Sequence, residues 1–303
     1  MTSRVEDDLD RIADVVAARI RAQLGVAPRI GSEPGHACTG SCKSGGSCTC
    51  CGNCAARRPD DVKSVVQHGA ARITAQAGTP QVSTDLAGLI DHTLLKPEAT
   101  PGDIRKLCDE ARQHGFASVC VNSSHVSRAK SHLGGSQVKV CAVVGFPLGA
   151  MAPGAKAFEA REAVRGGAGE IDMVMNIGAL KAGDFALVQD DIARVVTAAR
   201  PARVKVILET GMLDDEEKVA ACTLAKLAGA HFVKTSTGFG KGGATAADVA
   251  LMRRVVGGAM GVKASGGIRD QQDAIQMVRA GADRLGCSAG VAIVTGKKAV
   301  AGY

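Results

Sequence analysis

DEEKVAACTLAKLAGAHFVKTSTGFG, residues 215–240, contains the unit that is repeated through most of the chain. Its first part, 215–229, has the spacing of apolar residues that predicts a helix. A short apolar strand follows at 231–237, and a glycine-rich turn ends it. Lys234 lies inside this strand, where an ammonium group is costly to bury without a partner. The stretch predicts a helix–strand unit that carries an unusual buried lysine.

Eight strands of this kind are predicted from residue 85 onward, with starts roughly 22 to 34 residues apart and helical patterns between them. Near-continuous apolar strands that alternate with helices are typical of a parallel sheet, and eight of them predict an α/β fold, a closed (β/α)8 TIM barrel. A doubly wound open sheet is the alternative, but no glycine-rich fingerprint follows the first strand. The strands are 86–90 (LAGLI), 116–122 (FASVCVN), 138–146 (VKVCAVVGF), 170–176 (EIDMVMN), 204–210 (VKVILET), 231–237 (HFVKTST), 261–267 (GVKASGG) and 284–290 (RLGCSAG).

Polar residues stand within or just after these strands, where a parallel barrel has its active site. We expect Asp91 after the first strand, Asp172 within the fourth and Ser288 in the eighth. The others are Asn122, Glu209, Lys234 with Thr235, and Lys263.

Lys234 and Lys263 lie on adjacent predicted strands, which brings their ammonium groups within several ångströms. At an effective dielectric near 20, two unit charges about 4 Å apart repel by roughly 4 kcal/mol, which is enough to lower a lysine pKa by about three units. A neutral amine attacks carbonyl groups, and Asp172 is placed to accept and return a proton. The alternative is a buried Lys–Asp salt bridge that only fixes the register of the strands.

Glycine-rich turns follow the last three strands, as TSTGFGKGG, SGGIR and GCSAG. Loops after strands seven and eight of such barrels often bind phosphate through backbone N–H groups. The alternative is that these glycines only form turns. Three such turns side by side favour a phosphate pocket.

Eight motifs of the chain resemble deoxyribose-phosphate aldolase, a class I aldolase family of the TIM-barrel type. The resemblance covers residues from about 85 to the C-terminus. The motifs are IDHTLLKPEAT (90–100), CVN (120–122), VVGFPLG (143–149), EIDMVMNIGAL (170–180), KVILETG (205–211), VKTSTGFG (233–240), VKASGGIR (262–269) and RLGCSAGVAIV (284–294).

The resemblance implies reversible cleavage of 2-deoxy-D-ribose 5-phosphate to D-glyceraldehyde 3-phosphate and acetaldehyde, with a covalent lysine imine and no metal or other cofactor. By motif, Lys234 forms the Schiff base, Asp172 donates and accepts protons, and Lys263 completes the relay and depresses the pKa of Lys234. Asp91 is a substrate-side candidate. The phosphate-binding positions implied by the family are Gly238, Gly266, Gly267, Gly286 and Ser288.

Three further positions bear on phosphate binding and on proton transfer. Some family members have a lysine where this chain has Phe239, which leaves open whether Lys241 replaces it. Some have a second serine where this chain has Ala289, so one hydroxyl for the phosphate is expected to be missing. Members often end in a tyrosine that assists proton transfer; Tyr303 is the last residue here, and a catalytic contribution and a frayed end both stay open.

Two further side chains are assigned structural roles. Cys120 is expected near the pocket as a packing residue that aldehyde products can modify. His92 is expected to be a hydrogen-bonded structural histidine.

The composition limits the classes of partner. Aromatic residues are 2% of the chain and Trp is absent, which argues against nucleic acid, and no apolar run is long enough for a membrane span. The net charge of +7 suits an anionic small substrate. We expect a cytoplasmic enzyme that assembles as a homo-oligomer, a dimer.

Residues 1–84 form an extension that the barrel, residues 85–303, does not need. A capping box and a three- or four-residue apolar spacing predict an amphipathic helix over 3–24, and a weaker pattern predicts a second helix over about 60–77. A helix with an apolar stripe and a Gly/Ser tether is a docking element and resembles the peptides that target enzymes into bacterial microcompartments. The alternatives are packing on the barrel and dimerisation.

The linker between these helices, residues 36–56, is rich in cysteine. Metal binding and a flexible redox-sensitive linker both stay open, because the spacing is not that of a standard zinc knuckle. The candidate ligands are Cys38, Cys42, Cys48, Cys50, Cys51 and Cys54. Assembly or metal binding through residues 1–84, with weak or altered barrel activity, is the alternative function.

Overall fold

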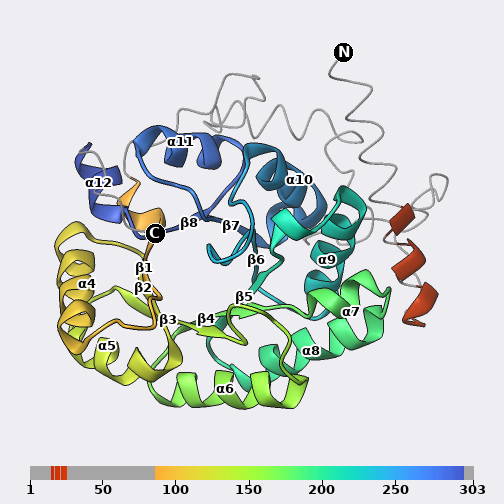
Figure 1. Cartoon of the computed structure of the whole chain (residues 1–303), viewed down its shortest axis with the longest axis horizontal. Coiled ribbons are helices and arrows are strands. Elements are labelled where there is room, and N and C mark those ends of the chain that lie inside the picture. Colours follow the sequence, from red (N-terminus) through yellow and green to blue (C-terminus); the bar gives the residue numbers. More distant parts are fainter. Residues whose placement is uncertain (1–14, 17, 21, 26–85, 297–303) are drawn as a thin grey trace, which may run out of the picture. The chain divides into compact units, whose positions relative to one another are not determined.

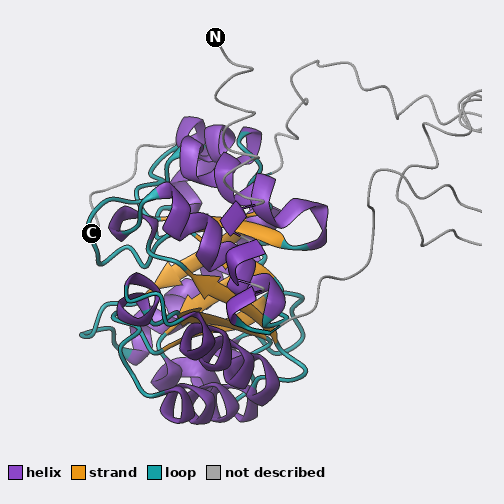
Figure 2. Cartoon of the chain, turned by 90° about the vertical axis from the view of Figure 1, so that its right-hand side faces the viewer, coloured by secondary structure: helices purple, strands orange, loops and turns teal. Residues whose placement is uncertain are grey.

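A computed structural model describes residues 15–16, 18–20, 22–25 and 86–296 of the chain. Eight parallel strands close into a barrel in the order β1-β2-β3-β4-β5-β6-β7-β8, as predicted. Figures 1 and 2 show the ring of strands inside a layer of helices. The strands are β1 Ile90–Leu94, β2 Ser118–Val121, β3 Lys139–Val144, β4 Glu170–Val174, β5 Arg203–Ile207, β6 Phe232–Lys234, β7 Gly261–Ser265 and β8 Arg284–Cys287.

Helices connect each strand to the next, and their ends follow local capping rules. Thr100 and Asp103 form a capping box at the start of α4, and Gly115, with φ of 68°, ends it in the left-handed conformation. The helices are α4 Pro101–His114, α5 Val126–His132, α6 Pro153–Arg165, α7 Ile177–Lys181, α8 Phe185–Ala198, α9 Asp215–Leu227, α10 Ala246–Val256, α11 Gln271–Arg279 and α12 Gly290–Thr295.

The two faces of the strands have different chemistry. In β4, Ile171 and Met173 belong to the main hydrophobic core. The residues that alternate with them, Glu170 and Asp172, form ion pairs with Lys205 of β5. Because successive side chains of a strand point to opposite faces, this alternation places charged groups together on one face of the closed sheet.

A buried ion pair in the helical layer fixes the end of β4. The ammonium group of Lys156, on α6, lies 2.6 Å from a carboxylate oxygen of Asp191, on α8, and donates a 2.9 Å hydrogen bond to the carbonyl oxygen of Val174. Val174 is the last residue of β4, two positions after Asp172. The pair therefore holds the strand that carries the central carboxylate.

The first strand lies later in the sequence than predicted. The prediction at 86–90 is wrong for most of that range, since Ala87–Leu89 is a 3-10 helix and β1 begins at Ile90. Asp91 therefore lies inside the strand and not after it. A charged residue is tolerated there because Ser118 and Arg284 bind its carboxylate. Thr235 and Ser288, which were predicted in strands, directly follow β6 and β8.

Little of the N-terminal extension is described. Residues 15–16, 18–20 and 22–23 are helical, which agrees with part of the helix predicted over 3–24. Ile20 is buried and Val15 is exposed, as expected of an amphipathic helix. The cysteine-rich segment 36–56, the second helix predicted over about 60–77, and Tyr303 all lie outside the described residues. In the part of the chain that is described, no helix combines the length and apolar character of a membrane span.

Candidate active site

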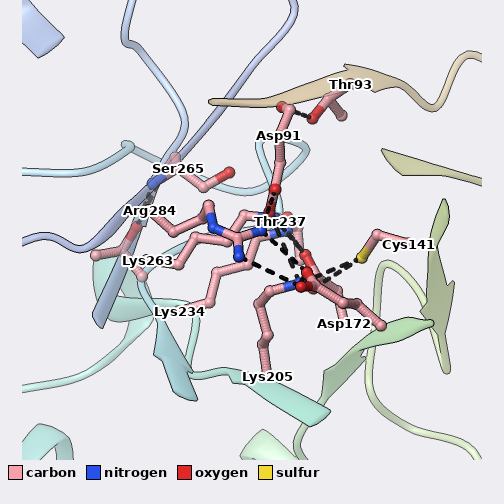
Figure 3. Close-up of polar contacts among 12 residues, drawn as sticks. Asp91, Thr93, Cys141, Asp172, Lys205, Lys234, Thr237, Lys263, Ser265 and Arg284 are labelled. Carbon is pink, nitrogen blue, oxygen red and sulfur yellow. Dashed lines mark hydrogen bonds and ion pairs between the residues drawn. The ribbon is translucent and has the colours of Figure 1, made fainter. Parts of the chain in front are cut away.

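Three lysine ammonium groups surround one buried carboxylate, that of Asp172 in the barrel interior (Figure 3). Its Oδ2 accepts hydrogen bonds from the Nζ atoms of Lys234 and Lys263, at 2.8 and 2.7 Å. Its Oδ1 accepts a 3.0 Å hydrogen bond from Lys205 Nζ. The two predicted lysines therefore share a single oxygen of the predicted aspartate.

The register of the parallel strands explains this convergence. Lys234 of β6 pairs with Lys263 of β7, and Asp172 of β4 pairs with Lys205 of β5. Register partners in a sheet point to the same face, and closure of the barrel brings β4 and β7 within reach of each other. The site is thus built from four consecutive strands.

Lys205 is a functional-site residue that the sequence analysis missed. It is fully buried and forms ion pairs with Asp172, Glu170 and Asp91. The signal was present, because Lys205 interrupts the apolar strand 204–210 in the way that Lys234 interrupts its own strand. Only the pairing of β5 with β4 shows which carboxylates it serves.

Asp91 belongs to the same charged network. Its carboxylate lies 2.5 Å from Lys263 Nζ, and it accepts hydrogen bonds of 2.7 Å from Arg284 and 2.6 Å from Ser118. It was predicted as a substrate-side group, but the structure surrounds it with protein groups at 0% exposure. Asp91 and Asp172 thus both anchor Lys263.

The buried carboxylates and ammonium groups of the site stabilise one another's charged forms. Burial by itself raises the pKa of the Asp172 carboxyl, but Lys205, Lys234 and Lys263 outweigh it and hold that pKa well below its usual range. The same balance, with Lys263 as the largest attractive partner, lowers the pKa of Asp91. In return, the carboxylates raise the pKa of Lys205 and of Lys263, although burial alone would lower both. Both carboxylates and these two lysines are therefore charged at neutral pH.

The glycines predicted to hold phosphate lie in loops at the carboxyl ends of β6, β7 and β8. Gly238, Gly266 and Gly267 have φ of 87°, 90° and 80°, in the left-handed region that favours glycine. The first two loops touch, since the N–H of Ala244 donates a 2.9 Å hydrogen bond to the carbonyl oxygen of Gly266. These loops therefore present exposed backbone side by side.

Gly286 and Ser288 complete the set on and after β8. A Cβ on Gly286 would lie 2.7 Å from Ser265 Oγ and 2.8 Å from Lys263 Cε, so only glycine fits beside that lysine. Ser288 is exposed in the loop that follows β8. All five predicted phosphate positions thus lie at one end of three neighbouring strands.

Glu209 is a second residue whose position the sequence did not explain. It has φ of 58°, the one positive φ of a non-glycine residue in the described backbone, and it is buried. Its carboxylate accepts hydrogen bonds from the hydroxyl and from the backbone N–H of Thr237, the latter at 3.2 Å. A Cβ on Gly240 would lie 3.0 Å from this carboxyl carbon. Glu209 therefore anchors the loop after β6.

Two further positions were singled out from the sequence. The ring of Phe239 is 46% exposed and meets the edge of Phe146, with ring centroids 5.3 Å apart. Phe239 thus makes an apolar contact between two loops. His92 Nε2 lies 2.8 Å from a carboxylate oxygen of Glu110, which confirms the predicted structural hydrogen bond.

Within residues 86–296, one group of His, Cys, Asp or Glu side chains is close enough to share a metal ion: Cys120, Cys141 and Asp172. Their candidate ligand atoms lie within 4.8 Å of one another. The carboxylate of this group is already bound by three ammonium groups, which repel a cation. The arrangement therefore fits amine and acid–base chemistry better than metal coordination.

Comparison with known proteins agrees with this chemistry. The family model "DeoC/LacD family aldolase" matches residues 86–298. Deoxyribose-phosphate aldolases from Macrococcus caseolyticus and Geobacillus sp. (strain WCH70) are 58% and 57% identical over 219 and 223 residues. These alignments cover 72% and 73% of this chain and 100% of each relative.

Solved structures of aldolases show the same barrel. The tetrameric deoxyribose phosphate aldolase from Aeropyrum pernix is 36% identical with a TM-score of 0.66, covering 70% of this chain and 90% of that one. The aldolase QR15 is 42% identical with a TM-score of 0.68, covering 70% of this chain and 95% of its own.

Proposed function

The chain belongs to the DeoC/LacD aldolase family, and on this premise we propose that it cleaves 2-deoxy-D-ribose 5-phosphate reversibly to D-glyceraldehyde 3-phosphate and acetaldehyde. The observation that carries the proposal is the pair of lysine ammonium groups, Lys234 and Lys263, on one oxygen of buried Asp172. An amine beside a carboxylate that accepts and returns protons is the machinery of imine chemistry.

Lys234 is the nucleophile in this proposal, and its surroundings support that choice among the three lysines. Lys205 has ion pairs with three carboxylates and Lys263 with two, which raise the pKa of both. Among the described residues Lys234 has one ion pair, with Asp172. It is also the last residue of β6, at the end of the barrel where the glycine-rich loops lie. Lys234 is thus the amine least committed to carboxylates.

The reaction follows from the substrate and the products. The Lys234 amine condenses with the C1 aldehyde, and the resulting iminium draws electrons from the C2–C3 bond as the C3 hydroxyl loses its proton. Asp172 accepts and returns protons, and Lys263 relays them. The positive charge of Lys263 favours the neutral, nucleophilic form of Lys234. Tyr303 stays a prediction for assisting proton transfer.

The substrate phosphate is proposed to bind the loops after β6, β7 and β8. Their exposed glycine backbone can donate N–H groups to an anion. Gly238, Gly266 and Gly267 supply closely approaching backbone, Gly286 lies buried within β8 beside them, and Ser288 supplies a hydroxyl. Phe239 and Ala289 provide neither a charge nor a hydroxyl at the two positions where some relatives do.

Turnover of the purified chain tests the function. We expect cleavage of 2-deoxy-D-ribose 5-phosphate, measured by release of the aldehyde products, and borohydride trapping of acetaldehyde on the protein as a mass increase. Unphosphorylated deoxyribose should be cleaved with a KM raised about tenfold or more, because the phosphate contacts are lost. A chain that neither cleaves the phosphate ester nor traps acetaldehyde would overturn the proposal.

Residues 1–84 are proposed to serve assembly and not catalysis, by docking to a shell or scaffold partner such as a bacterial microcompartment in the cytoplasm. In the described part of the helix, Ile20 belongs to the main hydrophobic core and Val16 and Leu24 pack against it, which supports the alternative that this helix packs on the barrel. The barrel is proposed to form a homodimer. Exposed apolar side chains at Leu148, Met151 and Phe158 offer such a surface. The six cysteines of the linker are proposed to serve this same assembly role, with or without a bound metal.

A chain that starts near Asp85 separates assembly from catalysis. It should keep turnover within about twofold of the full chain and keep a dimer mass in light scattering, because the site and the exposed apolar surface lie within residues 86–296. Metal analysis of the full chain, with the shortened chain as control, tests the linker. Loss of turnover on truncation would contradict an accessory role for the extension.

A further inference from the structure

We propose that Cys120 and Cys141 form a dithiol that hydrogen peroxide oxidises to an intramolecular disulfide, and that this disulfide inhibits the enzyme. The link to inhibition rests on the proposed function of Asp172; the formation of the disulfide does not. Neither thiol itself reacts in the imine chemistry described above.

The strands hold the two thiols close together. Cys120 of β2 and Cys141 of β3 are register partners, so their Cα atoms are separated by the spacing of neighbouring strands, about 4.8 Å. Disulfides form across Cα separations of roughly 4.4 to 6.8 Å. Both side chains are fully buried and pack in one small cluster with Leu95 and Val143, and their sulfur atoms lie within 4.8 Å of each other. Closure of the disulfide therefore requires rotation of two side chains without a rearrangement of the sheet.

The two thiols have unequal chemistry, as a nucleophilic and a resolving thiol require. The interaction with the neighbouring Cys141 thiol lowers the pKa of the Cys120 thiol, although burial alone would raise it. Burial, followed by the interaction with Cys120, raises the pKa of Cys141 well above its usual value. Cys120 is therefore the thiol that becomes a thiolate and reacts first.

The oxidation balances with peroxide as the oxidant. The Cys120 thiolate attacks one peroxide oxygen, an S–O bond forms, the O–O bond breaks and hydroxide leaves. Cys141 sulfur then attacks the sulfenic acid, the S–S bond forms and the S–O bond breaks. The departing hydroxide takes the Cys141 proton. In total, two thiols and one peroxide give one disulfide and two waters, and a dithiol reductant reverses the change.

The disulfide removes a contact of the central carboxylate. The Cys141 thiol donates a hydrogen bond to Asp172 Oδ1, with a sulfur–oxygen distance of 3.1 Å, and Lys205 Nζ lies 3.5 Å from the same sulfur (Figure 3). A disulfide has no S–H, so Asp172 loses this donor while it keeps its three lysines. Loss of a hydrogen bond to a charged group corresponds to about a tenfold or greater fall in rate.

Peptide mapping and turnover on the same samples test the proposal. The full chain is treated with hydrogen peroxide, quenched, digested with trypsin without reduction, and analysed by mass spectrometry. Residues 113–128 and 140–156 are separate tryptic peptides that carry Cys120 and Cys141. We expect them to become cross-linked as turnover falls about tenfold or more, and dithiothreitol to reverse both changes.

Serine variants identify the thiols responsible. C120S and C141S should each keep, after peroxide, the turnover that the same variant had before it. C222S is the matched control, because Cys222 is a buried thiol on α9 whose burial raises its pKa to about 12; it should cross-link and lose turnover as the unchanged chain does. All variants retain the six cysteines at 38–54, so oxidation there is common to every sample.

Several outcomes would overturn the proposal: inactivation without the cross-linked peptides, the cross-link without inactivation, or loss of turnover by C120S at the rate of the unchanged chain. If a serine variant does not fold, C120A replaces it. The cross-link in the unchanged chain still decides whether the disulfide forms. Because the cross-link is read by mass, it is separate from the proposed function. A chain inactive before treatment refutes the aldolase assignment, whereas an active chain without the cross-link refutes the dithiol.

Discussion

The Lys234→Arg variant is expected to lose the aldol reaction while keeping the fold. Arginine retains the positive charge that pairs with Asp172 but cannot form the imine, since its guanidinium stays protonated. We expect kcat/KM for 2-deoxy-D-ribose 5-phosphate to fall about 10,000-fold or more, and the borohydride-trapped acetaldehyde adduct to disappear. Mass spectrometry of the trapped peptide measures the second effect.

The control for this variant is Lys106→Arg. Lys106 lies on α4 with its side chain 77% exposed and a weak 3.9 Å ion pair, so its replacement should change neither turnover nor trapping. If Lys234→Arg still traps acetaldehyde on residues 205 or 263, the nucleophile has been assigned to the wrong lysine.

Replacing Asp172 with asparagine should have the second large effect, and it acts on stability as well as on rate. Asparagine keeps the shape of the side chain but leaves the buried ammonium groups of Lys205, Lys234 and Lys263 without the carboxylate they share. Breaking a buried ion pair costs about 3–5 kcal/mol, and we expect a loss of that size in the free energy of unfolding. Turnover should fall about 1,000-fold, because the proton acceptor is removed. Denaturant unfolding and steady-state kinetics measure the two effects.

Asp190→Asn is the matched control for stability. Asp190 forms a 2.6 Å ion pair with Arg194 in which both side chains are about half exposed, and such pairs contribute about 0–1 kcal/mol. Its replacement should leave turnover unchanged. An Asp172→Asn variant as stable as Asp190→Asn would contradict the role of the Asp172 carboxylate as the shared partner of the three buried lysines.

The pH dependence of unfolding gives an independent check on Asp172. Its pKa is lowered in the folded protein, chiefly because Lys205, Lys234 and Lys263 outweigh the effect of burial. The stabilisation is therefore complete above the unfolded pKa, about 3.9, and is lost as pH falls below it toward the folded pKa. Unfolding free energy should decline between about pH 4 and 2 in the unchanged chain, and less steeply in Asp172→Asn. Equal slopes would count against the ion-pair network.

The barrel and the core of the site were predictable because they follow local patterns. Helical spacing and apolar strands alternate along the chain, and a lysine inside an apolar strand is conspicuous in the letters alone. Lys234 and Lys263 were recognised in this way, and the order of their strands placed them side by side. Asp172 was conspicuous for the same reason.

The features of the site that the sequence did not predict have a different cause in common. Lys205 carries the same local signal as Lys234, but its meaning depends on carboxylates from β1 and β4, far away in the sequence. Asp91 was placed after its strand because the strand was predicted at 86–90, whereas β1 begins at Ile90. Glu209 was correctly expected at the end of its strand, but its left-handed backbone is explained only by the loop that it anchors. A local sequence pattern carries no information about contact partners that are distant in the sequence.

By itself the sequence determined the type of fold, because strand and helix periods depend on near neighbours. Its motifs, which resemble those of an aldolase family, indicated the family and pointed to two lysines and one aspartate. The tertiary structure decided which charged groups lie together as ion pairs. It placed Lys234 and Lys263 on one oxygen of Asp172, bound Lys205 to three carboxylates, and brought Cys120 against Cys141. The reason is physical: the pairing of buried charges and thiols depends on distances of a few ångströms across strands, and closure of the barrel sets those distances.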